Sequence, residues 1–545
     1  MKRYLILDCY VDEPACLGVP PFISPYPRYI YGALIAGGVE SESIDYLTID
    51  DLRITQYSIQ KDYSFIFLIG GSSVPGKYLG SKIGTRTEIE KIITNNSHHK
   101  FAIGGLISSV LSSNFDNAVP VKNDIEKYAS GYVKGNPTDG IRTSDEIALW
   151  SRLGACVIKT HHRFPEIICE IETSRGCPRL NHCSFCSEGL FKEIEFREPE
   201  HILMEIESLI EAGASRFRIG RQADIIQYKS SLSDFKNGFP RPNPSAIINL
   251  FSPIRKMISD GKISILNVDN GNPGSIFNFP DESSIILSEI AQTVTPGDTL
   301  PFGVESFDPA VVSANNLKVS EDEAFFAVKL LNEIGSFRKE GIPVLLPGIN
   351  LIHGLKGETD TTFEKNYRAL SRILDAGLLL KRINIRKFQE YPGTPAENFK
   401  FKSGRGVENR FKYYKEKIRD DIDTEMLRKI YPPGTIIKDI QILDNKGGFS
   451  YGKQIASYSI TVKFPMELSD KKFYDGIIVD HNERSLTALP YPADFLTLPR
   501  KALEIIPGIS KKAASDIILK RPDISKLEIA EILKFTDKKI SEKIF

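Results

Sequence analysis

The sequence has no long hydrophobic run and no net charge. No stretch approaches the roughly 20 apolar residues that a helix needs to cross a bilayer, and Asp8 interrupts the first apolar run too early for a signal peptide. Because 70 basic residues balance 70 acidic ones, any binding of nucleic acid has to come from a local patch. We therefore expect a cytoplasmic protein without a membrane partner.

Cysteine is also scarce. The seven cysteines are an odd number and mostly lack regular spacing, which argues against a disulfide scaffold. A hydrophobic content of 41% and a charged content of 26% are ordinary for a globular protein. The 545 residues are enough for about three or four domains.

Three of the seven cysteines lie in one short segment, TSRGCPRLNHCSFC, at residues 173–186. The segment follows a strand-like run, EIICEIE, and is bracketed by Gly176 and Gly189. A structural zinc site uses four protein ligands, whereas an iron-sulfur cluster held by three cysteines keeps one iron open to a substrate or cofactor. The pattern therefore favours a catalytic cluster on Cys177, Cys183 and Cys186.

This segment resembles the cluster loop of the radical S-adenosylmethionine (SAM) enzyme superfamily. Ser184 and Phe185 fill the second gap as that family requires, whereas the first gap, residues 178–182, has five residues where the family usually has three. The resemblance implies a 4Fe-4S cluster, SAM as cofactor with Phe185 among its contacts, and cleavage of SAM to a 5'-deoxyadenosyl radical. His182 stays open as a further ligand, and a zinc knuckle completed by His182 is the alternative.

The middle of the chain alternates strand and helix patterns from residue 199 onward. Strands are expected at 216–220, 263–268, 299–306, 343–355 and 382–388, and helices at 199–214, from Ser320 with Glu323 as a capping pair, and from Thr361 with Glu364. Repeated strand-helix units indicate a parallel sheet, whose ligands gather at the carboxyl ends of the strands. The polar stretch 230–244 is either a shaper of substrate entry or a surface loop.

Residues 160–400 resemble the partial (β/α)6 barrel of radical SAM enzymes. The resemblance implies that Glu305 and Ser306 contact the ribose of SAM and that the segment with His353 and Gly354 contacts adenine. Gly220 and Asp224 are the candidates for binding the methionine amino group, and Arg218 or Arg221 is an alternative partner for the methionine carboxylate. FQEYPGTPAE, at 388–397, resembles the ending of the sixth strand.

Residues 1–150 form another α/β pattern, with strands expected at YLILDCY, SFIFLIGG, KFAIGG and, at 128–136, YASGYVKGN. This Rossmann-like domain ahead of a radical SAM barrel resembles the cobalamin-binding class, which implies cobalamin and methyl transfer. A domain that has lost its cofactor and serves as a lid is the alternative. Cys9 and Cys16 are expected to be packed thiols rather than ligands.

Residues 424–492 alternate apolar and polar positions, which predicts a small β-barrel that resembles the RNA-binding barrel of methylthiotransferases. Residues 497–545 resemble a helix-hairpin-helix element, in which Lys511 and Lys512 suit a phosphate oxygen. The alternative is a helical cap on the barrel. A tRNA methylthiotransferase would need three further cysteines before residue 150, and the sequence has only Cys9 and Cys16 there.

The sequence thus predicts an α/β enzyme with a Rossmann-like domain, a radical SAM partial barrel, a small β-barrel and a helical hairpin. The predicted activity is cobalamin-dependent methylation of a macromolecule, either RNA or protein. A reducing partner such as ferredoxin or flavodoxin is implied by the resemblance. A tRNA methylthiotransferase-like enzyme and a zinc-containing nucleic-acid-binding protein without catalysis are the alternatives.

Overall fold

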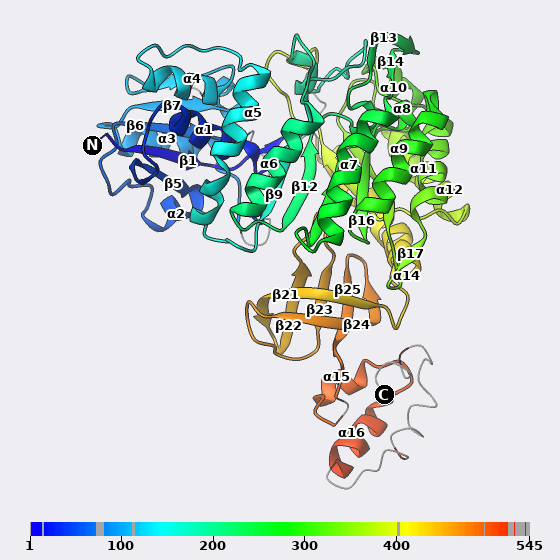
Figure 1. The fold of residues 1–545 in the computed structure, drawn as a ribbon. Helices are drawn as coiled ribbons and strands as arrows, with labels where there is room; N and C mark the ends of the chain where they lie inside the picture. Colours follow the sequence, from blue (N-terminus) through cyan, green and yellow to red (C-terminus); the bar gives the residue numbers. More distant parts are fainter. Residues whose placement is uncertain are drawn as a thin grey trace. The chain divides into compact units, whose positions relative to one another are not determined.

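The computed structural model describes residues 2–13, 16–71, 81–111, 115–399, 404–494 and 496–521, together with residues 528 and 540. The chain divides into two compact units. The N-terminal unit consists of Met1–Val294 with Gln389–Phe399, and the C-terminal unit of Thr295–Phe388 with Lys400–Phe545. Figure 1 shows their helices and strands. The boundary after residue 294 falls inside the region for which the sequence predicts a single barrel.

A five-stranded parallel sheet begins the N-terminal unit. Its spatial order is β5 (Ile44–Thr48), β1 (Tyr4–Asp8), β6 (Phe65–Ile69), β7 (Phe101–Gly104) and β8 (Ala118–Pro120). β1, β6 and β7 are buried along their whole length, which explains their continuous apolar runs. The three strands predicted there are confirmed. Because β1 lies between β5 and β6, the chain changes direction beside β1, and such a point is where doubly wound sheets bind ligands.

Helices α1 (Pro25–Ala36), α2 (Ile49–Ile54), α3 (Arg86–Asn95), α4 (Ile125–Val133) and α5 (Ser144–Leu153) accompany this sheet. Ile89, Ile92 and Ile93 of α3 join the strands in one apolar core. The strand expected at 128–136 is wrong, because that segment lies largely in α4. Ile125, Tyr128 and Ala129 are spaced three or four apart and are buried together, so a helical period buries this segment where an alternating one would not.

A second parallel sheet of the N-terminal unit has the order β15 (Ile265–Val268), β12 (Arg216–Arg221), β9 (Ile168–Glu172) and β4 (Phe22–Ile23). Its helices are α6 (Pro199–Glu211), α7 (Pro244–Ser259), α8 (Pro273–Asn278) and α9 (Pro280–Thr293). The strands and the helix predicted here are confirmed. β4 comes from the region predicted as a separate first domain, so the two regions share a sheet.

Residues 230–244 form more regular structure than an insertion loop. β13 (Ser231–Lys236) and β14 (Phe239–Arg241) pair as an antiparallel hairpin. Asn237 and Gly238 join the strands with φ values of 50° and 80°, as a two-residue hairpin turn requires. The Asn-Gly pair was therefore the signal for this hairpin. Shorter pairs are β2 (Asp12–Glu13) with β3 (Cys16–Leu17), and β10 (Ser174–Arg175) with β11 (Glu195–Phe196).

The C-terminal unit begins with a parallel sheet of β16 (Asp298–Glu305), β19 (Leu345–His353) and β20 (Arg382–Lys387). Helices α10 (Pro309–Ala314), α11 (Glu321–Gly335) and α12 (Asp360–Asp375) connect these strands, and β17 (Arg338–Lys339) pairs with β18 (Ile342–Pro343). The capping pair Ser320 and Glu323 is confirmed. The other start is wrong by two residues, because Thr359 and Thr362 form the cap of α12.

A closed five-stranded barrel follows helices α13 (Arg405–Ile418) and α14 (Thr424–Ile430), which a five-residue π-helical segment, Arg419–Asp423, joins. Around the barrel the strands are β21 (Ile436–Lys446), β22 (Phe449–Gln454), β23 (Thr461–Phe464), β25 (Ser485–Tyr491) and β24 (Phe473–Asn482). The predicted small β-barrel is thereby confirmed, and its strands are coloured gold to orange in Figure 1.

Two short helices, α15 (Arg500–Glu504) and α16 (Lys511–Lys520), follow the barrel. Leu503, Ile506 and Ile517 share a core with Ile477 and Leu489 of the barrel, so the helical pair packs on it. This packing is the one expected of a helical cap. The rest of the predicted helix-hairpin-helix region, residues 522–545, lies outside the described residues except for 528 and 540. Among the described residues, no helix has the length and apolar character needed to span a membrane.

Candidate cluster and cofactor site

The three cysteines of the predicted cluster lie in one loop of the N-terminal unit. The loop follows β9 and β10, so it begins at the carboxyl end of a parallel strand. Cys183 is buried, Cys177 and Cys186 are partly exposed, and none of the three forms a disulfide. The backbone N–H of Cys186 donates to the carbonyl of Cys183 at 3.2 Å, which turns the chain between these two residues.

Buried charges hold the two ends of this loop together. The N–H of Gly176, which has a φ of 84°, donates to Glu188 Oε2 at 3.1 Å. Arg221, at the end of β12, donates to the other oxygen of Glu188 at 3.0 Å. Glu188 is only 3% exposed, so these two donors replace the water that its oxygens lose on burial. The loop is thus fixed to its own start and to the neighbouring strand.

A guanidinium group lies against one of the sulfurs. Arg179 Nη1 is 3.4 Å from Cys183 Sγ, and both residues are buried. The guanidinium thus donates a hydrogen bond to a sulfur that the sequence predicts as a cluster ligand. His182 Nε2 contacts the carbonyl oxygen of Cys177 at 3.0 Å. That nitrogen is a donor here and is not available as a metal ligand.

The segment predicted as the ending of the sixth strand also supports the cysteine loop. It belongs to the N-terminal unit, and the N–H of Ala396 donates to the carbonyl of Ser184 at 2.8 Å. Ser184 lies between Cys183 and Cys186, so the contact is made within the part of the loop that carries the cysteines. This hydrogen bond ties the segment to the cysteine loop.

Three more of the predicted cofactor residues lie in the N-terminal unit. Phe185 is partly exposed within the cysteine loop. Gly220 lies in β12, where an added Cβ would come within 2.6 Å of Glu170 Oε1. Asp224 accepts hydrogen bonds from the N–H groups of Ile226 and Asn272, at 3.0 and 3.1 Å, and from the hydroxyl of Ser275 at 2.7 Å. The Asp224 carboxylate thus helps to position the start of α8.

The two arginines weighed for the methionine carboxylate are both paired with protein carboxylates. Arg218 forms buried ion pairs with Glu170 and Asp269. Arg221 pairs with Glu188 and also donates to the hydroxyl of Tyr26 at 3.1 Å. These pairs neutralise the buried charges, and they give both guanidinium groups a structural role.

In the C-terminal unit, Glu305 and Ser306 lie at the carboxyl end of β16. Glu305 has a φ of 67°, which is rare for a residue with a side chain, and it is 7% exposed. Its burial raises the pKa of its carboxyl, while Lys318, 3.5 Å away, and Arg386 oppose this shift. Ser306 accepts the N–H of Asp308 at 3.2 Å. A strained, buried carboxylate at a strand end is typical of a functional position.

His353 and Gly354 lie at the carboxyl end of β19 in the same unit. His353 Nδ1 is 2.9 Å from Glu358 Oε2, and the imidazole stacks on Phe363 with a centroid separation of 4.2 Å. Gly354 has a φ of 100° and turns the chain away from the strand. Both predicted positions are therefore at the strand edge where ligands are expected.

The carboxyl edge of the first sheet carries two Gly-Gly pairs. Gly70 and Gly71 follow β6, and Gly104 and Gly105 lie at the end of β7. Gly105 has a φ of 79°, and an added Cβ would lie 2.4 Å from the carbonyl oxygen of Gly70. The two strand ends therefore approach each other with space only for backbone. Close approach of bare backbone is typical of a surface that binds a phosphate or a flat cofactor.

Cys9 and Cys16 are confirmed as packed thiols. They are 0% and 1% exposed. Burial raises the pKa of the Cys9 thiol well above its usual value, and the nearby Asp8 adds to this shift. Cys16 Sγ lies 3.0 Å from Glu170 Oε2.

Sequence reasoning missed a network of buried ion pairs that joins the first sheet's helices to the stem of the cysteine loop. Arg142 pairs with Glu126 of α4 at 2.6 Å and with Glu172 at the end of β9. Arg175, two residues before Cys177, pairs with Asp124. These partners are 16 to 51 residues apart, so no local pattern indicates them.

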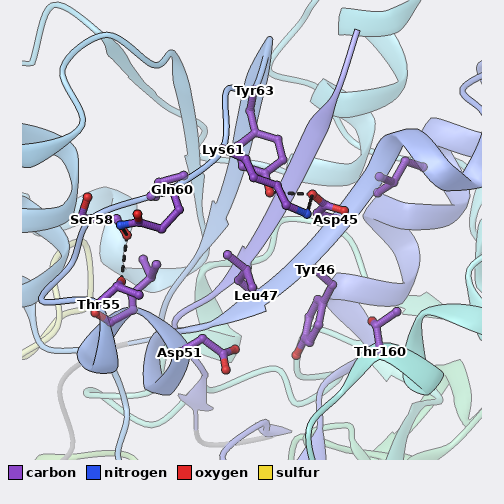
Figure 2. A pocket seen from close by; sticks show the side chains of 13 residues that line it. Asp45, Tyr46, Leu47, Asp51, Thr55, Ser58, Gln60, Lys61, Tyr63 and Thr160 are labelled. Carbon is purple, nitrogen blue, oxygen red and sulfur yellow. Dashed lines mark hydrogen bonds and ion pairs between the residues drawn. The ribbon is translucent and has the colours of Figure 1, made fainter. Parts of the chain in front are cut away.

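A separate cavity of about 400 Å³ lies along the edge strand β5 and α2 (Figure 2). The Asp45 carboxylate at its rim accepts hydrogen bonds from Tyr63 at 2.6 Å and from Arg3 and Lys61 at 3.1 Å each. Burial alone would raise the pKa of Asp45, but these donors outweigh it and lower the pKa. The cavity contains none of the residues that the sequence predicts as functional.

Comparison with known proteins places the chain in a family. A protein of Archaeoglobus fulgidus is 37% identical over 547 residues, with 97% of each chain covered. A protein of Methanocaldococcus jannaschii is 39% identical over 512 residues, which cover 89% of this chain and 92% of that one. Both carry the description "uncharacterized protein". The chain belongs to the same family as these two archaeal proteins. No family model matches it.

Among solved structures, a radical S-adenosylmethionine methyltransferase, TsrM of Kitasatospora setae, determined with cobalamin and a 4Fe-4S cluster bound, is 14% identical. The match covers 72% of this chain and 74% of that one, with a TM-score of 0.48. The cobalamin-dependent radical enzyme OxsB is 13% identical over 79% of this chain and 56% of that one, with a TM-score of 0.44.

Proposed function

We propose that the chain is a radical SAM enzyme that transfers a methyl group with cobalamin as a second cofactor. The observation that supports this most is the cysteine loop, which carries three cysteines outside any disulfide after the carboxyl end of β9, with Arg179 hydrogen-bonded to Cys183. Three thiolates on one loop suit an iron-sulfur cluster with one open iron. The spacing of Cys177, Cys183 and Cys186 resembles that of the superfamily, apart from the longer first gap.

When bound, a 4Fe-4S cluster supplies the electron that breaks a carbon-sulfur bond of SAM. The chain's own residues hold the cluster and orient the cofactor. Arg179 donates a hydrogen bond to Cys183 Sγ, and the Glu188–Arg221 pair keeps the loop in one conformation. Rigid support of this kind matters because a reacting carbon has to lie within about 3–3.5 Å of its partner.

The proposed contacts with SAM follow from the resemblance. Glu305 and Ser306 would accept and donate hydrogen bonds at the ribose, and His353 and Gly354 would border the adenine. Phe185, Gly220 and Asp224 are proposed contacts in the N-terminal unit. Burial raises the pKa of the Glu305 carboxyl even with Lys318 beside it, and two ribose hydroxyls would be suitable additional donors to its carboxylate form.

Substitution of one cluster cysteine tests the proposal directly. After anaerobic reconstitution, the wild-type chain should contain about four irons and should consume SAM when reduced. Cys183→Ala should lose both properties. Cys156→Ala is the matched control, because Cys156 is a free cysteine on the exposed surface outside the loop. The proposal would be refuted if Cys183→Ala still cleaved SAM. It would also be refuted if the wild type contained about one zinc and did not bind SAM, and that result would favour the non-catalytic nucleic-acid-binding alternative.

The cobalamin part of the proposal is supported by the first sheet. In its strand order the chain changes direction beside β1, which is where doubly wound sheets bind ligands. The glycine pairs at the ends of β6 and β7 leave bare backbone at the carboxyl edge of this sheet. Because Cys9 and Cys16 are fully buried, this edge does not offer the three thiolates of a second cluster. Cobalamin is therefore a better match for it than the sulfur-donating cluster of a methylthiotransferase.

Incubation with hydroxocobalamin and gel filtration tests this part by visible absorption. The wild type should co-elute with the cofactor, and Gly105→Ala should bind it more weakly, because its Cβ would collide with Gly70. Gly38→Ala is the control, since Gly38 also has a positive φ, of 87°, but has open space around it. Elution of the wild type without cobalamin would favour the lid alternative and leave the SAM chemistry standing.

We further propose that the barrel and its two helices bind a macromolecular substrate. Phe449 at the barrel surface has Lys463 Nζ 3.9 Å and Lys501 Nζ 5.2 Å from its ring centroid. An aromatic ring flanked by cations suits a nucleic-acid base next to its phosphate. Mass spectrometry of RNA and of protein from a deletion strain should reveal a missing methyl group. If the methyl group is missing from protein alone, RNA is excluded as the substrate.

A further inference from the structure

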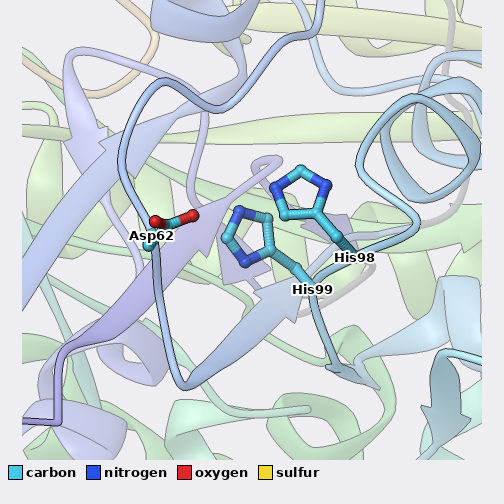
Figure 3. A group of neighbouring side chains, drawn as sticks. All are labelled: Asp62, His98 and His99. Atoms are coloured by element: carbon cyan, nitrogen blue, oxygen red, sulfur yellow. The ribbon is translucent and has the colours of Figure 1, made fainter.

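Three potential metal ligands meet at the amino edge of the first sheet, the edge opposite to the glycine pairs. Asp62 lies in the loop before β6, and His98 and His99 lie in the turn before β7. Because β6 and β7 are paired in parallel, the segments that lead into them are neighbours. One carboxylate oxygen and one nitrogen from each imidazole lie within 4.8 Å of one another. Figure 3 shows the carboxylate and both rings turned toward one another.

The hydrogen bonding of His99 makes one of its nitrogens a ready ligand. His99 is 2% exposed, and its Nδ1 contacts the carbonyl oxygen of Tyr63 at 3.2 Å. A carbonyl can only accept, so Nδ1 carries the proton and Nε2 carries a lone pair. Nε2 is buried and has no hydrogen-bond partner in the described structure. Metal-binding histidines are typically oriented in this way, by a carbonyl on the opposite nitrogen.

The two segments are also fixed relative to each other before any ion binds. The buried side chain of Asn96 accepts the N–H of Ile59 at 2.9 Å and donates to the carbonyl of Tyr57 at 2.8 Å, so it ties the turn after α3 to the loop before β6. The N–H of Ile66 donates to the carbonyl of Lys100 at 2.9 Å. The ligands therefore do not have to be gathered by folding a free loop, which lowers the entropic cost of binding.

We propose that Asp62, His98 and His99 form a binding site for a divalent transition-metal ion, with Zn²⁺ as the expected occupant. Two imidazoles and one carboxylate are a ligand set that zinc accepts, with water in the fourth position. The ion would give the buried His99 Nε2 the partner that it lacks and would join the loop before β6 to the turn before β7. The site is independent of the cluster and of the proposed methyl transfer.

Zinc binding to the full-length, cluster-loaded chain tests this proposal without any activity assay. X-ray absorption at the zinc edge should show a first shell of nitrogen and oxygen at about 2.0–2.1 Å, whereas zinc on the cluster cysteines would show sulfur at about 2.3 Å. Asp62→Asn and His98→Ala change exposed side chains, so both should fold. Each should weaken zinc binding by at least about tenfold.

His162→Ala is the matched control. His162 also stands in a His-His pair, stacked on His161 at a centroid separation of 4.5 Å, but it is not one of the proposed ligands. This variant should bind zinc as the wild type does, and zinc should raise its thermal unfolding midpoint as it does that of the wild type. The proposal would be overturned if zinc in the wild-type chain had only sulfur in its first shell. It would equally be overturned if Asp62→Asn and His98→Ala bound zinc as tightly as His162→Ala.

Discussion

Arg142 offers the sharpest test of how the cysteine loop is supported. Its guanidinium has no exposed surface, and it pairs with Glu126 at 2.6 Å and with Glu172 at the end of β9. It also lies 5.2 Å from the ring of Tyr29. Arg142→Met keeps most of the side-chain volume but leaves two buried carboxylates without their main cation. Breaking a buried pair in this way costs about 3–5 kcal/mol.

The expected result is a large loss of stability in the N-terminal unit. For a unit of this size, each kcal/mol lowers the unfolding midpoint by about 2 °C, so calorimetry should show a shift of roughly 6–10 °C. Arg152→Met is the control, because Arg152 is exposed on α5, and a surface change of this type should stay within about 0.5 kcal/mol. A second substitution, Glu126→Gln, should recover part of the loss because it removes one stranded charge.

The same variant should also affect the cluster. Glu172 is the last residue of β9 and lies five residues before Cys177, so loss of its partner loosens the stem of the cysteine loop. Iron content after reconstitution should fall along with stability. If Arg142→Met unfolds at the same temperature as Arg152→Met, then the buried network does not support the loop and the reasoning is wrong.

Three further predictions concern single residues. Burial raises the pKa of Asp8 to about 7, although hydrogen bonds from Tyr10 and Tyr46 oppose this shift. The stability that this group contributes is therefore present below its unfolded pKa of about 3.9 and is lost as the pH rises to about 7. Urea unfolding should show that Asp8→Asn gains a few kcal/mol of stability over the wild type across that pH range, at about 1.4 kcal/mol per pKa unit, and a difference that stays constant with pH would contradict this. Arg179→Met should lower the reduction potential of the cluster in a potentiometric titration, because a donor to a ligand sulfur favours the reduced state; an unchanged potential would exclude that role. Ser320→Ala should cost about 1 kcal/mol, measured by chemical unfolding, through loss of the cap of α11, and a change below about 0.3 kcal/mol would show that the cap is unimportant.

Local patterns in the sequence were sufficient for most of the parallel strands, for helices such as α6 and α11, and for the position of the cysteine loop. Runs such as YLILD and FIFLI are apolar at every position and form strands buried along their whole length. Ser320 and Glu323 signal a helix start through two hydrogen bonds made within three residues. The cysteine spacing is equally local. Each of these features depends on near neighbours in the chain, so the sequence alone indicates it.

Segments with mixed signals needed the tertiary structure. Residues 128–136 contain tyrosine, valine and glycine and resemble a strand, but the core accepts Ile125, Tyr128 and Ala129 only on one face of a helix. The start of α12 shifted because Thr359 and Thr362 make the cap in place of Thr361 and Glu364. In both cases several local solutions have similar free energies, and packing selects one.

The sequence by itself determined which residues we propose as cluster ligands and most of the segments that form the parallel strands. Only the tertiary structure decided how these parts are held. Arg142 meets Glu172 across 30 residues, and His99 meets Tyr63 across 36. Such pairs leave no periodic trace, because a single charged or imidazole side chain looks the same in a sequence whether it is solvated or buried against a partner. These contacts matter because the side chains are buried. An unpaired charge or lone pair inside the protein costs free energy, so each buried group needs a partner.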